Sequence, residues 1–563
     1  MQKWLDVAVS APAHSQVGGL LTYVTELPAS VGQLVRVPFG NREVLGVVWG
    51  VHTTAPQTLS THTLRQVIAV LEAVAPLSAH WLQLVQFTAH YYQRSLGEVA
   101  MAALPPQLRD LTPVQLARRF KKQVTPPETL DTALQSPWPL SEQQAEVLSQ
   151  MAEASGPFLL HGATGSGKTE VYLQAVARCL AEDPNAQALM MVPEINLTPQ
   201  LEERVKARFG DAGVVSMHSG MTGPQRLKSW LAAHQGSARI VLGTRMSIFA
   251  SMPHLKWIVV DEEHDASYKQ QEGARYSARD LAIYRARLEG AKVILGSATP
   301  SLESWHHSRP AAEGGRYLRL PMPARIGAGQ LPFVRRVDMN HQPRKTVLSA
   351  PLMAAIQERV AKGEQSMLLL NRRGYAPVLH CADCGWKSEC SHCSAFRVFH
   401  KIDRTLRCHH CGFTERVPRA CPACGNADIA PMGRGTEQLE EHLAELLVDV
   451  KRPNGNPVKV MRIDADSTKL KGSLEAQLAG VHSGEVDVLV GTQMIAKGHD
   501  FRRITLVAAI NPDGALFSSD FRAPERLFAL LMQAGGRAGR DAEQSASSEM
   551  WVQTFHPSHP LFE

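Results

Sequence analysis

Short apolar runs alternate with longer amphipathic stretches through the middle of the chain. The runs FLLHG, ALMMVPE, GVVSMH, RIVLGT, WIVVDEE and KVILGSAT have the length and composition of buried strands. The pattern returns after residue 365 with SMLLLNRRG, KVMRID, VDVLVGTQ and ITLVAAI. Strands that alternate with helices are typical of parallel sheets covered by helices. The sequence therefore predicts an α/β fold with two parallel-sheet lobes.

The segments outside this pattern indicate further domains. The N-terminal part is rich in strands around VGQLVRVPFG and REVLGVVWG, and a Pro-, Gln- and charge-rich stretch follows it. Ser141 is a candidate N-cap where the first lobe begins. The predicted boundaries are a β-rich N-terminal domain at 1–105, a linker at 106–139, lobe 1 at 140–340, lobe 2 at 341–380 and 425–557, and a cysteine-rich insertion at 381–424.

Composition narrows the class of protein. The 563 residues are too many for one core, and 44% hydrophobic with 20% charged residues is ordinary for a globular protein. No apolar run reaches the roughly 18 residues of a membrane span. Asp6 interrupts the short apolar stretch at the N-terminus, which makes it a poor signal peptide. We expect a cytoplasmic protein without a membrane partner; the net charge of +6 permits nucleic acid binding but does not establish it.

The sequence GATGSGKT follows the strand FLL and precedes a helix. This is the GxxxxGK[ST] phosphate loop in its strand–loop–helix context, where backbone N–H groups and the helix N-terminus bind phosphates. Lys168 is expected at the β- and γ-phosphates and Thr169 at magnesium. The predicted ATP-binding residues of the loop are Gly162, Ala163, Thr164, Gly165, Ser166, Gly167, Lys168 and Thr169.

Two later segments supply the remaining groups that ATP hydrolysis needs. IVVDEEH brings Asp261 and Glu262 to the carboxyl end of a strand, where such folds bind nucleotide. We expect Asp261 to bind magnesium and Glu262 to orient the attacking water. QAGGRAGR, from Gln533 to Arg540, offers Arg537 and Arg540 to the charge that develops at the γ-phosphate. These arginines must arrive from lobe 2, which would link hydrolysis to closure of the lobes.

Eight of the nine cysteines form four CxxC pairs within the insertion. Two such pairs complete a tetrahedral zinc site, so the pattern predicts two structural zinc ions without an open coordination position. An iron–sulfur cluster is the minor alternative, and spacing alone does not decide which pairs share a metal. The predicted ligands are Cys381, Cys384, Cys390, Cys393, Cys408, Cys411, Cys421 and Cys424.

The ordered motifs resemble those of superfamily 2 helicases, and several stretches resemble the PriA family in particular. The general motifs are LSEQQ with Gln144, VPEINLTPQ, GTRMSIF, GSATP and GTQMIAKGHDF. The PriA-like stretches are DEEHDASYKQQEGARYSARD, FRAPER and NRRGYAP running into the cysteine block. The resemblance extends over roughly residues 18–560.

The resemblance implies an ATP-dependent 3′→5′ DNA helicase with RecA-like lobes. Such an enzyme recognises stalled or abandoned forks, unwinds lagging-strand duplex and initiates primosome assembly. It implies that Gln144 reads adenine, that residues 267–276 form an aromatic loop which senses DNA, and that the zinc pairs are nested. Implied partners are forked and single-stranded DNA, primosome proteins and single-strand DNA-binding protein, and a monomer at the nucleoid is expected. Residues implied to face DNA are Pro193, Glu194, Thr244, Arg245, Gly491 and Thr492.

The N-terminal domain is implied to read a 3′ end through Gly40, Arg65 and the Tyr91–Tyr92 stretch. The chain departs from the family in three ways. Thr22 stands where the family's aromatic–Asp–Tyr motif has aspartate, which puts recognition of the 3′ hydroxyl in question. The linker at 106–139 is too short for the family's winged-helix domain, and 558–563 would only begin the family's C-terminal domain.

Three alternatives remain from the sequence. The motor could be vestigial in a fork-binding primosome scaffold with little helicase activity, although Lys168, Glu262, Arg537 and Arg540 are all retained. An RNA helicase or a different DNA translocase is disfavoured by the paired zinc motifs. The basic and aromatic residues of the insertion are either a small core with solvated charges, or a wedge that contacts forked DNA or docks primosome proteins.

Overall fold

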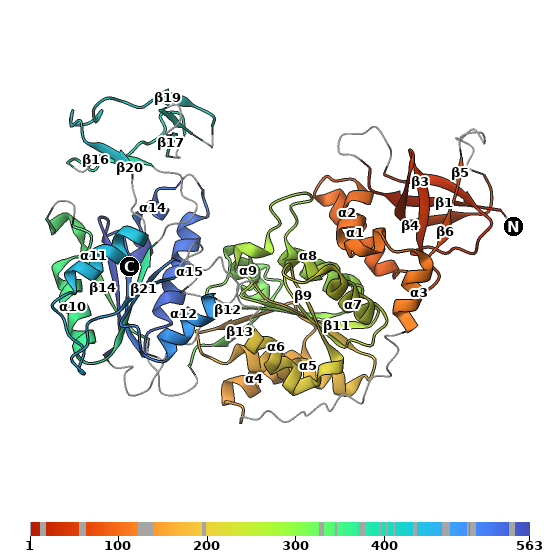
Figure 1. Cartoon of the computed structure of the whole chain (residues 1–563), viewed down its shortest axis with the longest axis horizontal. Coiled ribbons are helices and arrows are strands. Elements are labelled where there is room, and N and C mark those ends of the chain that lie inside the picture. The colour runs from red at the N-terminus through yellow and green to blue at the C-terminus, as the bar shows by residue number, and fades with distance from the viewer. Residues whose placement is uncertain are drawn as a thin grey trace. The chain divides into compact units, whose positions relative to one another are not determined.

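The computed structural model divides the chain into two compact units (Figure 1). The first comprises Met1–Gly162 and Gly167–Met322, and the second comprises Ala163–Ser166 and Pro323–Glu563. The described residues are 2–11, 19–55, 64–121, 139–193, 199–325, 331–343, 346–370, 378–381, 383–393, 396–400, 404–408, 411–431, 436–463, 473–492, 495, 501, 503–518, 520–539 and 547–563.

The first unit begins with a six-stranded sheet in the order β5-β2-β1-β4-β3-β6. Its main pairs are antiparallel, and alternate side chains such as Leu5, Val7 and Val9 are buried on one face. The strands are β1 (Lys3–Val9), β2 (Leu21–Thr25), β3 (Leu34–Phe39), β4 (Arg42–His52), β5 (Arg65–Gln66) and β6 (Ala69–Val70).

Three helices follow this sheet, α1 (Ala79–Tyr91), α2 (Leu96–Ala103) and α3 (Pro113–Lys121). Residues 106–121 fall in the segment expected to be a linker, yet Leu108 and Leu116 are buried in the same core as α1 and α2. The expected linker therefore begins as packed structure, and residues 122–138 lie outside the described part of the chain.

A parallel seven-stranded sheet forms the rest of the first unit, in the order β13-β7-β12-β11-β8-β10-β9. Its strands are β7 (Phe158–Gly162), β8 (Gln187–Met191), β9 (Val214–Met217), β10 (Ile240–Gly243), β11 (Leu255–Asp261), β12 (Lys292–Ser297) and β13 (Leu318–Met322). The helices are α4 (Glu142–Glu153), α5 (Lys168–Glu182), α6 (Pro199–Phe209), α7 (Gly223–His234), α8 (Ala278–Glu289) and α9 (Leu302–His307).

Helices cover both faces of this sheet, as the near-continuous apolar strands require. Helices α4, α5 and α6 lie on one face, and α7 and α8 lie on the other (Figure 1). The core on the α7 and α8 face continues into the N-terminal domain, where Trp81 of α1 donates its indole N–H to the Phe249 carbonyl at 2.9 Å. Phe87 of α1 also stacks on Tyr284 of α8 with ring centroids 3.7 Å apart. The N-terminal domain and lobe 1 therefore share one core.

The second unit contains a parallel sheet in the order β14-β24-β23-β15-β22-β21. Its strands are β14 (Phe333–Asp338), β15 (Gln365–Leu370), β21 (Val460–Ile463), β22 (Val488–Gly491), β23 (Ile504–Ile510) and β24 (Glu549–Thr554). Helices α10 (Ala350–Ala361) and α11 (Thr436–Leu446) cover one face, and α12 (Ser473–His482) and α15 (Ala523–Gly535) cover the other (Figure 1). A short helix, α14 (Asp513–Leu516), follows β23.

The cysteine-rich insertion leaves this unit after β15 and forms two small antiparallel sheets. One pairs β16 (Leu379–Cys381) with β20 (Ile429–Pro431), so the two ends of the insertion lie side by side. The other contains β17 (Val398–His400), β18 (Thr405–Arg407) and β19 (Thr414–Arg416). Together these elements confirm the predicted fold class of two parallel-sheet lobes, a cysteine-rich insertion and a β-rich N-terminal domain.

Candidate functional site

The phosphate loop joins β7 to α5, as the sequence predicts. Gly165 and Gly167 adopt positive φ of 87° and 81°, a conformation that side-chain-bearing residues rarely adopt. No described atom lies within 4 Å of where a Cβ on Gly165 would be, so the loop leaves open space at that point. Lys168 is buried and its Nζ donates to the Gly162 carbonyl at 2.9 Å. A tight glycine loop with a buried lysine at a helix N-terminus fits a nucleotide phosphate.

Gln144 lies next to this loop. Its Nε2 donates to the Gly167 carbonyl at 3.2 Å, and its Oε1 accepts from the Ser141 backbone N–H at 2.9 Å. Ser141 and Gln144 thereby form the capping box of α4. The side chain predicted to read adenine therefore fixes α4 against the loop in this structure, and adenine recognition stays a prediction.

Asp261 and Glu262 stand at the carboxyl end of β11, the edge of the parallel sheet where β7 also ends. Burial, and then the neighbouring Glu262 carboxylate, raise the pKa of Asp261 to about 6, while Lys168 opposes this rise. Lys168 begins α5, and Tyr172 of the same helix is hydrogen-bonded to the Asp261 carboxylate, so both residues lie at this edge of the sheet. Glu262 has a φ of 47°, an unusual conformation for a non-glycine residue and one that clusters at functional sites.

The third acidic residue of this run, Glu263, was not singled out by the sequence. Its side chain is fully buried and accepts hydrogen bonds from the Ser301 N–H at 2.6 Å and from the Ser304 hydroxyl at 2.8 Å. Arg279 of α8 forms an ion pair with this carboxylate, with its Nη1 3.4 Å from Glu263 Oε2. Glu263 therefore links the end of β11 to the segments after β12, and no local pattern could have indicated this.

The segment from Ser267 to Tyr276 is fixed at both ends. The Tyr268 hydroxyl lies 2.6 Å from the Asp261 carbonyl and 3.0 Å from the Met191 carbonyl. At the other end, the Tyr92 hydroxyl of the N-terminal domain accepts from the Ser277 N–H at 3.0 Å. Lys269 also lies over the Tyr92 ring, 5.1 Å from its centroid. The segment thus contacts both the N-terminal domain and the strand that carries Asp261.

The predicted DNA-facing residues follow strand ends in both units. Thr244 follows β10, and the Arg245 guanidinium donates to the Ser267 carbonyl at 2.8 Å, so it holds the aromatic segment. Gly491 ends β22 and Thr492, which follows it, is buried. Pro193 is described but Glu194 lies outside the described residues.

The predicted arginines lie in the second unit. Gln533 is in α15, and Arg537 follows that helix; both side chains are buried. Arg325 donates to the Gly536 and Ala538 carbonyls on either side of Arg537, at 3.4 Å each. Arg540 lies outside the described residues. Approach of Arg537 and Arg540 to the phosphate loop stays a prediction.

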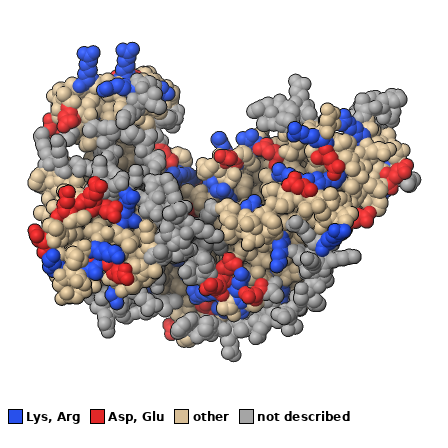
Figure 2. Space-filling view, viewed as in Figure 1, with Lys and Arg blue, Asp and Glu red and all other residues tan. Residues whose placement is uncertain are grey.

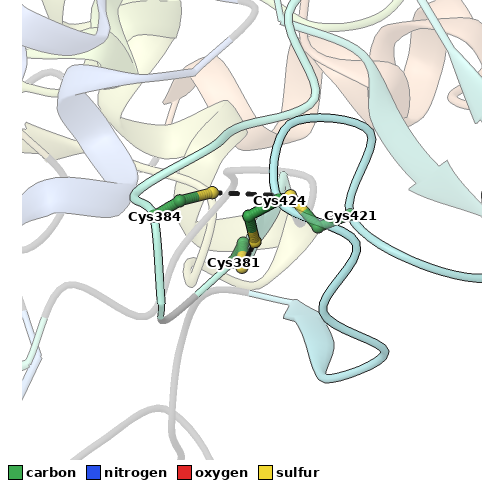
Figure 3. A group of neighbouring side chains, drawn as sticks. All are labelled: Cys381, Cys384, Cys421 and Cys424. Atoms are coloured by element: carbon green, nitrogen blue, oxygen red, sulfur yellow. Dashed lines mark hydrogen bonds between the residues drawn. The ribbon is translucent and has the colours of Figure 1, made fainter.

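The cysteines of the insertion gather in the two nested sets that the family resemblance implies. Cys381, Cys384, Cys421 and Cys424 form one set (Figure 3), and Cys390, Cys393, Cys408 and Cys411 form the other. Within each set all four sulfur atoms lie within 4.8 Å of one another, and several pairs are 3.5–3.6 Å apart. Tetrahedral zinc with Zn–S bonds of about 2.3 Å places its sulfurs about 3.8 Å apart. Both sets therefore fit structural zinc.

The insertion contacts lobe 2 through aromatic side chains. Lys387 lies over the Phe517 ring, 3.4 Å from its centroid, and Phe396 meets the same ring edge-on at 5.4 Å. Basic side chains project from the part of the insertion that carries β17 and β19 (Figure 2). Exposed arginines in this region are Arg404, Arg407, Arg416 and Arg419.

Comparison with known protein families shows which family this chain resembles. The family model described as a DEAD/DEAH box helicase matches residues 141–307, and the helicase conserved C-terminal domain matches 433–542. The PriA 3′ DNA-binding domain matches 6–105, and the PriA DNA helicase Cys-rich region matches 390–416. Replication restart protein PriA of Haemophilus influenzae is 37% identical over 604 residues, which covers 95% of this chain and 80% of the relative.

The chain belongs to the PriA family of replication restart proteins. PriA of Treponema pallidum is 34% identical over 564 residues, covering 100% of this chain and 81% of that protein. PriA of Bacillus subtilis is 41% identical over 431 residues, covering 75% of this chain and 51% of that protein. Like other PriA proteins, the chain has a 3′ DNA-binding domain, helicase domains and a cysteine-rich region. None of the described helices is both long and apolar enough to cross a membrane.

In the 3′ DNA-binding domain, Arg65 lies on β5 beside β2, Gly40 lies in the turn between β3 and β4, and Tyr91 ends α1. Arg65 donates to the Gly40 carbonyl at 2.5 Å, so these two expected residues are in contact. Thr22 stands opposite Asp6 in the β1–β2 register, and its hydroxyl donates to Asp6 Oδ1 at 3.0 Å. His52 lies 2.7 Å from Asp6 Oδ2. A carboxylate therefore lies one strand away from the position where the PriA motif has aspartate.

Proposed function

We propose that this PriA protein is an ATP-dependent 3′→5′ DNA helicase that recognises stalled or abandoned replication forks. It unwinds lagging-strand duplex and initiates primosome assembly for replication restart. The observation that carries the proposal is that the phosphate loop and Asp261 follow strands at one edge of the helicase sheet, where the helix after the loop bonds the Asp261 carboxylate. The proposal takes 140–340 as the ATP-binding lobe, and 341–380 with 425–557 as the second lobe.

Each predicted site residue has one role in the proposed hydrolysis of ATP. Bound ATP with magnesium would supply the phosphoryl group whose transfer to water drives movement. Lys168 binds the β- and γ-phosphates, and Thr169 and Asp261 hold the cation. Glu262 orients the attacking water, and Gln144 contacts adenine. Gln533, Arg537 and Arg540 complete the site when the lobes close, so hydrolysis depends on the state of both lobes.

We propose that the zinc-binding insertion contacts forked DNA. Its exposed arginines are suited to phosphates, and its two metals hold a module with little core of its own. Primosome proteins and single-strand DNA-binding protein are proposed partners because the chain belongs to the PriA family. A monomer in the cytoplasm, at the nucleoid, is the form we expect to act.

The 3′ DNA-binding domain is proposed to bind the 3′ end of a nascent strand, with Asp6 in the role of the missing aspartate. A terminal nucleotide has a 3′ hydroxyl that can donate a hydrogen bond, whereas an internal nucleotide has a phosphate at that position. A carboxylate accepts a hydrogen bond from the 3′ hydroxyl of a terminal nucleotide and repels the phosphate of an internal one. Asp6 is a partly exposed carboxylate on this sheet, with its side chain 28% exposed and its orientation fixed by Thr22 and His52.

Fork-stimulated ATPase and strand separation test the motor assignment. Wild-type protein is compared with Lys168→Ala and with Lys256→Ala, a change at an exposed lysine of β11. We expect Lys168→Ala to abolish both activities and Lys256→Ala to retain them. Substrates with duplex at either end of a single-stranded segment report polarity, and 3′→5′ movement displaces the strand at the 5′ end. ATPase that survives Lys168→Ala refutes the motor, and tight fork binding without unwinding by the wild type supports a scaffold instead.

A further inference from the structure

Tyr172 lies on α5, three residues beyond Thr169, and its side chain is almost completely buried at 1% exposure. Its hydroxyl donates to Asp261 Oδ1 at 3.0 Å. The bond joins the helix that begins at the phosphate loop to the carboxylate at the end of β11. The hydroxyl is the only part of this side chain that a phenylalanine would lack, and it is the part that reaches the carboxylate.

The neighbouring strand leaves room for this hydroxyl. Gly296 of β12 stands beside Asp261 in the β11–β12 register. A Cβ on Gly296 would lie 1.5 Å from the Tyr172 hydroxyl oxygen and 2.6 Å from the ring carbon that bears it. Real atoms do not approach so closely, so any side chain at position 296 would force the hydroxyl away. The glycine and the tyrosine are therefore complementary, and together they hold one oxygen atom against Asp261.

From this arrangement we infer that Tyr172 is a positioning residue for the divalent cation of the nucleotide site. The tyrosine fixes one oxygen of the Asp261 carboxylate, so that the other is presented to the cation in a single orientation. An oriented carboxylate binds a cation more tightly than one that must be ordered at binding. The inference rests on the proposed function, because it takes Asp261 as the residue that holds magnesium.

A second buried tyrosine gives the matched control. The Tyr268 hydroxyl lies 2.6 Å from the main-chain carbonyl of Asp261, not from its carboxylate. Replacing either tyrosine by phenylalanine removes one buried hydroxyl that touches the same residue. Only Tyr172→Phe releases the carboxylate itself. A difference between the two variants in metal binding therefore isolates the orientation of the carboxylate from a general loosening of β11.

The experiment measures cation binding separately from nucleotide binding, in full-length protein without DNA. Electron paramagnetic resonance of free Mn²⁺ gives the affinity of the protein–ADP complex for the cation. Displacement of a fluorescent ADP analogue in EDTA gives the affinity for nucleotide alone. For Tyr172→Phe we expect Mn²⁺ affinity to fall about tenfold, equivalent to about 1.4 kcal/mol. The Mg²⁺ concentration for half-maximal ATPase should rise by a similar factor, and ADP affinity in EDTA should change less than about twofold.

Two further measurements keep the test decisive if Tyr172→Phe is less stable. The increment in thermal midpoint that Mg²⁺ adds to the ADP complex should shrink, while the increment from ADP alone is retained. Gly296→Ala, which displaces the hydroxyl with Tyr172 intact, should weaken Mn²⁺ binding in the same way.

Equal loss of Mn²⁺ affinity in Tyr172→Phe and Tyr268→Phe overturns the inference, and so does unchanged Mn²⁺ affinity in Tyr172→Phe. Failure of the wild-type protein to bind nucleotide or hydrolyse ATP would instead refute the proposed function.

Discussion

Replacing Asp6 by asparagine should weaken the preference of the 3′ DNA-binding domain for a 3′ hydroxyl. The substitution keeps the shape of the side chain, and its carbonyl can still accept from Thr22, so the β1–β2 pairing should survive. What it removes is the negative charge that Thr22 and His52 hold in place. A neutral amide accepts more weakly from a hydroxyl, and it no longer repels a 3′ phosphate.

The size of the effect follows from the exposure of the carboxylate. A hydrogen bond to a charged group contributes about 1.5–3 kcal/mol. The Asp6 side chain is 28% exposed, and solvent screening brings its contribution to the lower end of that range. We therefore expect a loss of about 1.4 kcal/mol in discrimination, or about tenfold. Fluorescence anisotropy with recessed primers that end in a 3′ hydroxyl or a 3′ phosphate measures the ratio directly.

Glu43→Gln provides the control, because Glu43 is a half-exposed carboxylate on the same sheet and pairs with Arg36 at 3.7 Å. It should leave the ratio of the two affinities unchanged. The reasoning fails if Asp6→Asn retains the full preference of the wild type. It also fails if Glu43→Gln reduces the ratio as much, since the effect would then reflect the charge of the sheet in general.

Three other outcomes are expected. Cys408→Ser should lower zinc from about two to about one ion per chain by mass spectrometry, and retention of both would contradict the paired clusters. Burial lowers the pKa of His234, whose Nε2 lies 2.9 Å from the Ala75 carbonyl of the N-terminal domain. Protonation therefore favours the unfolded state, and stability present above about pH 6.5 should fall as the pH drops further; His234→Gln should flatten this dependence in thermal unfolding. Tyr92→Phe removes the acceptor of the Ser277 N–H, which should lower the free energy of unfolding by about 1 kcal/mol and speed amide hydrogen exchange in residues 267–277. Unchanged exchange would show that this hydrogen bond does not stabilise the segment.

Most of the strands that the sequence predicted in the two lobes are central strands buried on both faces, with the edge strands β9 and β21 as exceptions. Runs such as WIVVDEE and ITLVAAI are continuous apolar segments, because helices cover both sides of their sheets. No such apolar run marks β14, an edge strand whose Phe333 and Val334 are exposed, or β13, which contains Pro321. An edge strand has fewer neighbours, so its composition carries less information.

The residues of the candidate site also fall into two groups, those that a local sequence pattern predicts and those whose contacts depend on tertiary packing. The phosphate loop and Asp261 could be predicted because each is a local pattern that follows a strand. Tyr172 could not, because its partner is 89 residues away and the contact depends on how α5 packs against β11. Glu263 likewise acquires its partners only when the segment after β12 folds back. Spacing also left the metal pairing open, and the resemblance supplied it.

The nesting of the two zinc clusters sets an order in which the insertion can come apart. Cys393 and Cys408 of the inner cluster are 15 positions apart in the chain, and Cys384 and Cys421 of the outer cluster are 37 positions apart. With the inner metal in place, the outer ligands are tied together through a shorter free path, and the entropy lost on closing the outer loop is smaller. Loss of the inner metal releases only the part of the insertion that carries β17 and β18. Loss of the outer metal frees the neck where β16 meets β20, so that the module is held to lobe 2 only by its chain connections and by the contacts of Lys387 and Phe396 with Phe517.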